Sequence, residues 1–128
     1  MLPEPYQSRY GALRQSLEQL AGVVADPAGD GDAIERLFQT TQQQAQSVIS
    51  ADFEDLEGAI APRLRSYRTE INRQLRLLGT DVLFLKTSRQ PQTSQQRRAQ
   101  MGDRLQQLMG YCTASLELGD STHGDDAP

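Results

Sequence analysis

Few residues in this sequence can carry out chemistry: there is one histidine, His123, and one cysteine, Cys112. A lone cysteine excludes an intrachain disulfide and a metal site built from several thiolates, and a chain without disulfides fits a reducing compartment. A single histidine in a small, acidic C-terminal segment does not support Ser-His-Asp or Cys-His catalysis. CxxC, HExxH and glycine-rich phosphate-loop motifs are also missing. We therefore expect a protein that is not an enzyme, with no metal and no cofactor.

Long apolar runs are missing as well. No stretch approaches the roughly 18 consecutive apolar residues that a membrane span needs. The N-terminus lacks the basic region and apolar core of a signal peptide, so we expect a cytoplasmic protein. Tryptophan is absent and phenylalanine occurs three times, which predicts a mostly aliphatic core. A chain of 128 residues is long enough for one domain with a real core.

Apolar residues recur at spacings of three and four, the period of an amphipathic helix, and nothing alternates as a strand does. We predict a first helix over about 3–25 and a second that begins after Asp32 and ends near residue 50. A third should run unbroken from the region of Pro62 to about Gln90, and a fourth over about 94–118. Asp32 with Glu35 resembles a capping box, as do Thr93 and Gln96. A short helix capped by Asp52 should begin at residue 53, and a kink or break should fall between residues 58 and 62, near Pro62.

The last two predicted helices share a register. Their apolar stripes pair in antiparallel fashion, with residue numbers in each pair that sum to 183, and the midpoint lies in the turn at Pro91. The fold class that follows is all-α, a four-helix antiparallel bundle with a long C-terminal helical hairpin. Residues 1–118 should form a single helical domain, and residues 119–128 a disordered acidic tail.

Charge is divided unevenly along the chain, whose net charge is −4. Residues 1–60 hold three basic against ten acidic side chains, whereas residues 61–110 hold ten basic against three acidic ones. Such a block suggests either internal charge matching or a patch for an acidic partner. Nucleic-acid binding is an alternative, but an acidic protein whose aromatic residues lie mostly on apolar stripes disfavours it.

The segment 69–90 carries more large apolar residues than one stripe needs. Leu77 and Phe84 form a second line, which is buried either by neighbouring helices or by a second protomer. Asp81 lies between that line and the core stripe, within reach of arginines on the last helix. It either forms an intramolecular salt bridge or contacts a partner. The candidate interaction residues are Arg73, Arg76, Leu77, Asp81, Phe84, Arg89, Arg97 and Arg104.

Residues 65–112, RSYRTEINRQLRLLGTDVLFLKTSRQPQTSQQRRAQMGDRLQQLMGYC, resemble the cyanobacterial PatD family of heterocyst frequency control proteins. The likeness covers a little over a third of the chain, and the N-terminal half matches only in its helical layout. The matching elements are Thr69, Glu70, Ile71, Arg76, Leu77 and Leu78, then Asp81 to Gln90, Thr93, Ser94 and Arg97, and finally Asp103, Arg104, Leu105, Tyr111 and Cys112.

The resemblance implies a non-enzymatic regulator of heterocyst frequency and cell division. Such proteins are associated with the tubulin-like division protein FtsZ and influence its assembly. FtsZ is therefore the partner that the resemblance suggests. A homodimer through the second apolar line is the further expectation from the residues themselves. A passive helical scaffold is an alternative both to a PatD-like regulator and to a nucleic-acid-binding regulator.

Overall fold

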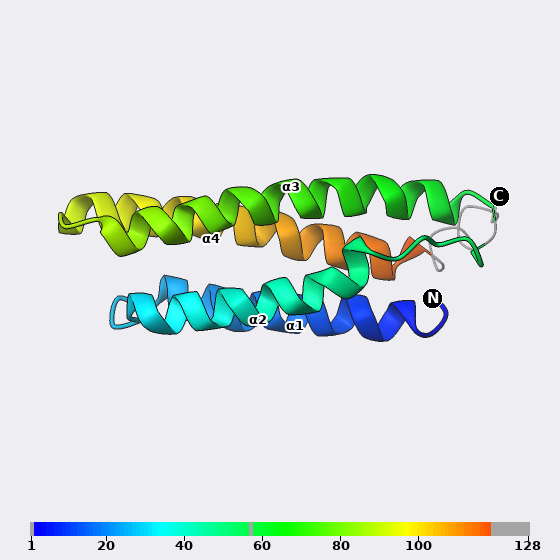
Figure 1. The fold of residues 1–128 in the computed structure, drawn as a ribbon, viewed down its shortest axis with the longest axis horizontal. Coiled ribbons are helices and arrows are strands. Elements are labelled where there is room, and N and C mark those ends of the chain that lie inside the picture. The colour runs from blue at the N-terminus through cyan, green and yellow to red at the C-terminus, as the bar shows by residue number, and fades with distance from the viewer. Residues whose placement is uncertain (1, 57, 119–128) are drawn as a thin grey trace.

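The computed structural model describes residues 2–56 and 58–118, and these residues form four antiparallel helices (Figure 1). The helices are α1 (Tyr6–Ala25), α2 (Gly31–Ile49), α3 (Ile60–Thr87) and α4 (Pro91–Leu116). Each helix packs against two others: α1 and α3 both contact α2 and α4. The α3–α4 hairpin extends beyond the α1–α2 pair at the end where α3 turns into α4. The predicted all-α bundle with a long C-terminal hairpin is confirmed.

The core is built from the predicted apolar stripes. Every residue of the α1 stripe is buried, and so is the weaker α2 stripe with its small and polar members. The antiparallel register, in which paired residue numbers sum to 183, correctly placed α3 and α4 as neighbours. The α4 stripe differs from the prediction only at its C-terminal end, where Ser115 is buried and Leu116 is half-buried. The buried stripe residues are Tyr6, Tyr10, Leu13, Leu17, Leu20 and Val24 on α1, then Ile34, Phe38, Thr41, Ala45 and Val48 on α2, Ile71, Leu75, Leu78, Val82 and Leu85 on α3, and Met101, Leu105, Leu108 and Cys112 on α4.

Several predicted helix starts were wrong. The first helix begins at Tyr6, after Pro5, instead of at about residue 3. The second is capped by Asp30, whose carboxylate accepts a hydrogen bond of 2.7 Å from the Ala33 amide, so Asp32 lies inside the first turn. The fourth begins at Pro91, because proline at the first helical position loses no hydrogen bond and already has a helical φ. Its predicted Thr93 cap is therefore not used.

The connection between α2 and α3 also differs from the prediction. No helix begins at Phe53, which adopts a φ of 63°, and Asp52 instead accepts a hydrogen bond of 3.1 Å from the Glu54 amide. The Phe53 side chain is fully buried, 5.5 Å from the Tyr6 ring between centroids. Burial of a large aromatic ring offsets the cost of the left-handed backbone conformation at a non-glycine residue. The predicted break before α3 is present, since Gly58 has a φ of 63°.

Pro62 does not kink α3, because it lies in the first turn. The helix starts at Ile60, so the carbonyl four residues before Pro62 belongs to Gly58, outside the helix. At its other end α3 stops at Thr87, three residues earlier than predicted. The helix therefore runs unbroken for 28 residues, longer than any other helix in the described part of the chain.

A glycine in α3 lets α2 approach closely. The Phe38 ring of α2 lies against Gly79, where an added Cβ would sit 3.2 Å from the Phe38 Cζ atom. Nearby, Lys86 of α3 forms an ion pair of 2.5 Å with Glu35 of α2, which raises the pKa of Lys86. These contacts hold the shorter α2 against the middle and end of α3.

Gly79→Leu should lower the free energy of unfolding by about 1–3 kcal/mol, because the new side chain overlaps the Phe38 ring. Gly110→Leu is the matched control, since an added Cβ at Gly110 meets nothing within 4 Å. It should raise stability by up to about 0.8 kcal/mol through helix propensity alone. Urea unfolding followed by circular dichroism measures both changes, and equal effects at the two positions would contradict this account of the α2–α3 contact.

Tyr6 should make stability depend on alkaline pH. Its hydroxyl donates a hydrogen bond to Asp55, which together with burial raises the pKa of Tyr6 to about 12, above the ordinary value near 10. The stabilisation is complete below about pH 10 and is lost as the pH rises from about 10 to 12, because the unfolded state ionises first. In Tyr6→Phe, the urea midpoint should be lower at pH 8 but fall less steeply above pH 10; an unchanged slope would show that Tyr6 is not responsible.

Candidate protein-interaction surface

A buried carboxylate joins the two helices of the C-terminal hairpin. Asp81 of α3 is 2% exposed, and both of its oxygens are bonded by arginines of α4. Arg104 Nε donates to Oδ2 at 2.6 Å, and Arg97 Nη1 donates to Oδ1 at 3.1 Å. The predicted intramolecular salt bridge is present, with both of the arginines that the register placed within reach. A carboxylate this deeply buried requires such partners to compensate for its lost hydration.

The charge of this cluster, defined as Asp81, Arg97 and Arg104, is not balanced. One carboxylate faces two guanidinium groups, which leaves a net positive charge at the surface of the hairpin. The two arginine side chains are 28% and 20% exposed, so both retain contact with water. The cluster therefore satisfies the buried carboxylate and also presents positive charge outward.

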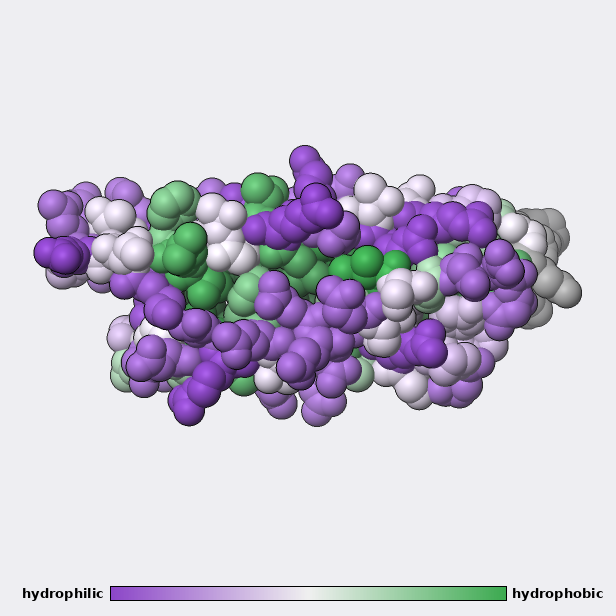
Figure 2. All heavy atoms as spheres, in the orientation of Figure 1, coloured by the Kyte–Doolittle hydropathy of each residue, from purple (hydrophilic) through white to green (hydrophobic). Residues whose placement is uncertain are grey.

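Three large apolar side chains of α3 are exposed, and two of them, Leu77 and Phe84, lie on the same side of the helix as Asp81. Leu77, Leu83 and Phe84 are 37%, 60% and 49% exposed, and among the described residues they are the only large hydrophobic side chains with this much exposure. Figure 2 shows hydrophobic atoms over α3 in a face that is otherwise largely hydrophilic. Neighbouring helices leave Leu77 and Phe84 exposed, so the first of the two predicted explanations is wrong, and burial by a second protomer stays a prediction.

Arg97 connects the buried charge to the exposed ring. Its guanidinium carbon lies 4.9 Å from the centroid of the Phe84 ring, within the range of a cation–π contact. Nη1 also donates to Gln100 Oε1 at 3.2 Å. Because Asp81 holds Arg97 on one side, the guanidinium is fixed over Phe84 rather than free to move in solvent. The structure thus brings together five of the predicted residues: Leu77, Asp81, Phe84, Arg97 and Arg104.

The other predicted residues lie around or away from this group. Arg89 is exposed and lines a pocket of about 400 Å³ at the α3–α4 turn, together with Phe84 and Arg97. Arg73 pairs with Glu70 on its own helix at 3.4 Å. Arg76 lies on another side of α3, where it lines a groove against α2. We define the hairpin surface as Leu77, Asp81, Phe84, Arg89, Arg97 and Arg104, which leaves out Arg73 and Arg76.

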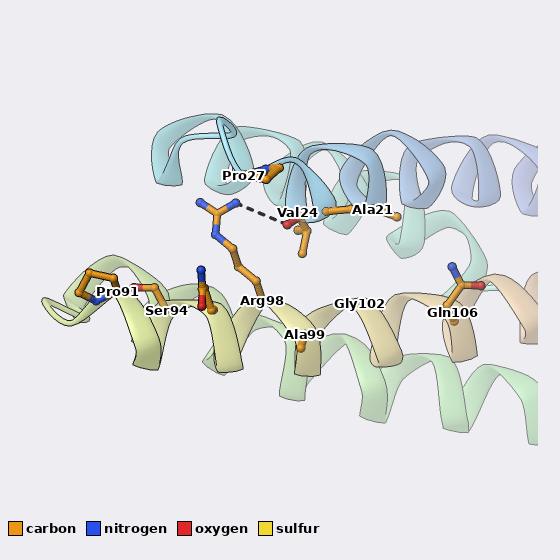
Figure 3. Close-up of a pocket in the computed structure, with 11 residues that line it drawn as sticks. Ala21, Val24, Pro27, Pro91, Ser94, Arg98, Ala99, Gly102 and Gln106 are labelled. Atoms are coloured by element: carbon orange, nitrogen blue, oxygen red, sulfur yellow. Dashed lines mark hydrogen bonds between the residues drawn. The ribbon is translucent and has the colours of Figure 1, made fainter.

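Sequence reasoning missed the structural use of other arginines. Arg98 of α4 reaches the end of α1, where it donates to the carbonyls of Val24, Asp26 and Gly29 at 3.4, 3.2 and 2.5 Å. Figure 3 shows this side chain crossing a groove of about 590 Å³ that is lined mainly by small and apolar residues. A cation there stabilises the negative end of the α1 dipole. The lack of a basic residue in the last turn of α1 was the available signal.

Arg68 of α3 plays a similar role at the opposite end of the bundle. It donates a hydrogen bond to the Ala51 carbonyl, and its guanidinium carbon lies 5.2 Å from the Phe53 ring centroid. Arg65 donates to the Asp52 carbonyl at 3.4 Å. Much of the basic block is therefore used within the chain, but these arginines bond to backbone carbonyls. The predicted charge matching with the acidic half is seen at Lys86 and Glu35.

No family model, curated protein or solved structure matches this chain. Within residues 2–56 and 58–118, no helix is long and apolar enough to cross a membrane. The same residues contain no group of three or more metal-ligating side chains. His123 and the predicted tail lie outside the described residues. Cys112 is fully buried, and burial raises the pKa of its thiol to about 12, as expected for a core residue rather than a reactive one.

The two sides of the ion cluster should respond differently to mutation. Arg104→Met should lower the free energy of unfolding by about 3 kcal/mol, because it leaves a buried carboxylate with one partner. Asp81→Leu should cost about 1 kcal/mol or less, since the two partly exposed arginines can be hydrated. The double variant Asp81→Leu/Arg104→Met should lose less than the two single variants added together. Urea unfolding of all four proteins measures this coupling, and additive losses would contradict it.

Proposed function

We propose that this chain is a non-enzymatic cytoplasmic regulator that acts by binding another protein at the hairpin surface. The observation that carries the proposal is the exposure of Leu77 and Phe84 beside the Asp81 ion cluster. Single exposed apolar residues are ordinary, but two on one line of a helix, with a guanidinium fixed over one ring, are typical of a binding surface. Aromatic and arginine side chains together dominate the energetics of protein interfaces.

The packing of the hairpin supports this role. The core stripes of α3 and α4 are buried against each other and against the remaining helices, and the ion cluster crosses between the two helices. A partner that binds here would meet side chains already held in place, and a preformed surface lowers the entropic cost of binding. The apolar area is small, so the complex that we propose is a regulated one rather than a permanent assembly.

The resemblance to the PatD family suggests the identity of the partner. The matching segment, residues 65–112, contains the whole hairpin surface. We propose that the partner is FtsZ, and that binding modulates its assembly and so cell division. In a filamentous organism that forms heterocysts, the same contact would influence their frequency.

A homodimer is the second candidate, because a second copy could cover Leu77 and Phe84. The net positive charge of the ion cluster opposes this arrangement, since a symmetric interface would bring two like-charged clusters together. Nucleic-acid binding receives less support than the number of arginines suggests. Arg65, Arg68 and Arg98 make hydrogen bonds to backbone carbonyls of this chain, and Lys86 is paired with Glu35.

The proposal predicts that the chain binds FtsZ of its own organism and changes its polymerisation, measured by pull-down and by light scattering. Leu77→Glu/Phe84→Glu should abolish both effects while leaving the helical circular dichroism spectrum unchanged. Leu83→Glu is the matched control, because Leu83 is exposed on the same helix but lies about 100° around it from Phe84. No binding by the wild-type chain, or full binding by the double variant, would overturn the proposal.

Size-exclusion chromatography with light scattering shows whether an external partner or a second copy of the chain covers Leu77 and Phe84. An external partner predicts a wild-type chain of monomer mass, close to the 14.2 kDa of the sequence. A dimer that Leu77→Glu/Phe84→Glu converts to monomer would instead show that a second copy covers this line.

A further inference from the structure

We propose that the hairpin surface recognises a short acidic segment of a protein partner, with a large apolar residue placed beside the acidic ones. This inference rests on the proposed function, because it states the chemistry of the ligand that the same surface binds. The apolar residue would pack on Phe84 and Leu77, and the neighbouring carboxylates would enter the pocket at the α3–α4 turn.

The turn pocket supplies the complementary charge. Its lining residues include Arg89 and Arg97, contain no aspartate or glutamate, and enclose about 400 Å³. They are Phe84, Thr87, Ser88, Arg89, Gln90, Thr93 and Arg97. Carboxylates in this pocket would meet two guanidinium groups, the Thr93 hydroxyl and the Gln90 side-chain amide. Arginine suits such a role, because its planar fork of donors matches the geometry of a carboxylate.

The first turn of α4 strengthens the positive character of this pocket. Gln90 precedes the helix without making a side-chain cap, and the turn that follows contains no acidic residue. Amide groups at a helix start carry partial positive charge when no capping side chain satisfies them. The exposed arginine and the aromatic ring carry the proposal, and the helix terminus adds to the same field.

The size and arrangement of the surface indicate a short segment rather than a whole folded domain. A pocket of about 400 Å³ holds one or two side chains, and the adjacent apolar line consists of Leu77 and Phe84. Arg97 connects the two parts, since it lines the pocket and lies over the Phe84 ring. One anchor residue next to one or two acidic residues would occupy both parts together.

The same charges disfavour the other occupants. A second copy would present Arg89 and Arg97 to the same two residues across a symmetric interface, where like charges repel. A nucleic acid would require positive charge well beyond one pocket, whereas the chain as a whole has a net charge of −4. A short acidic peptide avoids both penalties.

A random 12-residue peptide library displayed on phage, selected on the immobilised full chain at low salt, tests the proposal. The enriched peptides should carry net negative charge and at least one large apolar residue next to an acidic one. Enrichment without an acidic excess, or no enrichment at all, would overturn it. Adding salt to about 0.5 M should weaken binding, because partly exposed charges are screened.

Fluorescence anisotropy with the most enriched peptide, labelled with fluorescein, then locates the site. Arg89→Gln and Phe84→Ser should each weaken binding about tenfold or more, as expected for central contacts. Both side chains are largely exposed, so neither change removes a core contact. The matched controls are Arg63→Gln for charge, an exposed arginine at the opposite end of α3, and Leu83→Ser for apolar area. Both should change the affinity less than about twofold, the level of near-neutral surface contacts. Equal losses in controls and test variants would overturn the proposed site.

Two further results bear on the alternatives. Displacement of the peptide by a double-stranded DNA oligonucleotide at equal charge concentration would favour a nucleic acid and overturn the proposal. A homodimer that Phe84→Ser dissociates would favour a second copy of the chain and would also overturn the proposal. A peptide-binding chain that ignores FtsZ would end the FtsZ proposal but leave this inference intact. A chain that binds FtsZ without selecting acidic peptides would support the FtsZ proposal and overturn this inference.

Discussion

The buried carboxylate of Asp81 is the constraint that links the interior of the C-terminal hairpin to its surface, because it must stay paired with arginines of the facing helix. A carboxylate that is 2% exposed lies between two helices and is bonded on both oxygens from the opposite helix. Isolated in a protein interior, such a charge would cost several kcal/mol, so the two helices must stay together with Arg97 and Arg104 in place. The same constraint determines the outer surface, because it holds the Arg97 guanidinium over the Phe84 ring. A requirement of the interior therefore shapes the surface that we propose for binding.

Arginines perform a second structural task at the two ends of the bundle. Arg98 satisfies carbonyls where α1 ends, and Arg68 bonds the chain where α2 leads into α3. Backbone carbonyls at these points have no helical partner, and a guanidinium carries several donors in one plane. The basic half of the chain thus stabilises the turns of the acidic half. Of the arginines on the hairpin, Arg89 remains exposed at the turn pocket.

The fold followed from the sequence wherever one apolar stripe determined the packing. Leu78 and Leu105, for example, were correctly placed on facing stripes, because their repeats fit only one antiparallel register. Predictions were less accurate where a single local contact decides the geometry. Asp30 rather than Asp32 caps α2, and α4 begins at Pro91. Which of several neighbouring residues becomes the N-cap depends on backbone angles, and sequence spacing does not specify these angles. Phe53 was assigned to a helix because its burial against Tyr6, 47 positions away, is a tertiary contact.

The candidate site was predictable in part for the same reason. Asp81 and its two arginines follow from the register, since a charge at the edge of a stripe requires a partner on the facing helix. The exposure of Leu77 and Phe84 did not follow, because spacing alone does not tell whether a third helix covers them. Arg98 belonged to the basic block that was expected to match acidic side chains or an acidic partner, although its partners are carbonyls of a turn roughly 70 residues earlier.

Native-state hydrogen exchange tests the central claim, that the buried Asp81 carboxylate and its arginines keep the two helices of the hairpin from separating locally. The account predicts that amides of residues 78–85 and 101–108 exchange only through global unfolding, with one shared free energy. Amides of the α2–α3 connection should exchange through local opening, at a lower free energy. Exchange of residues 78–85 by local opening, as easily as the α2–α3 connection, would contradict the account.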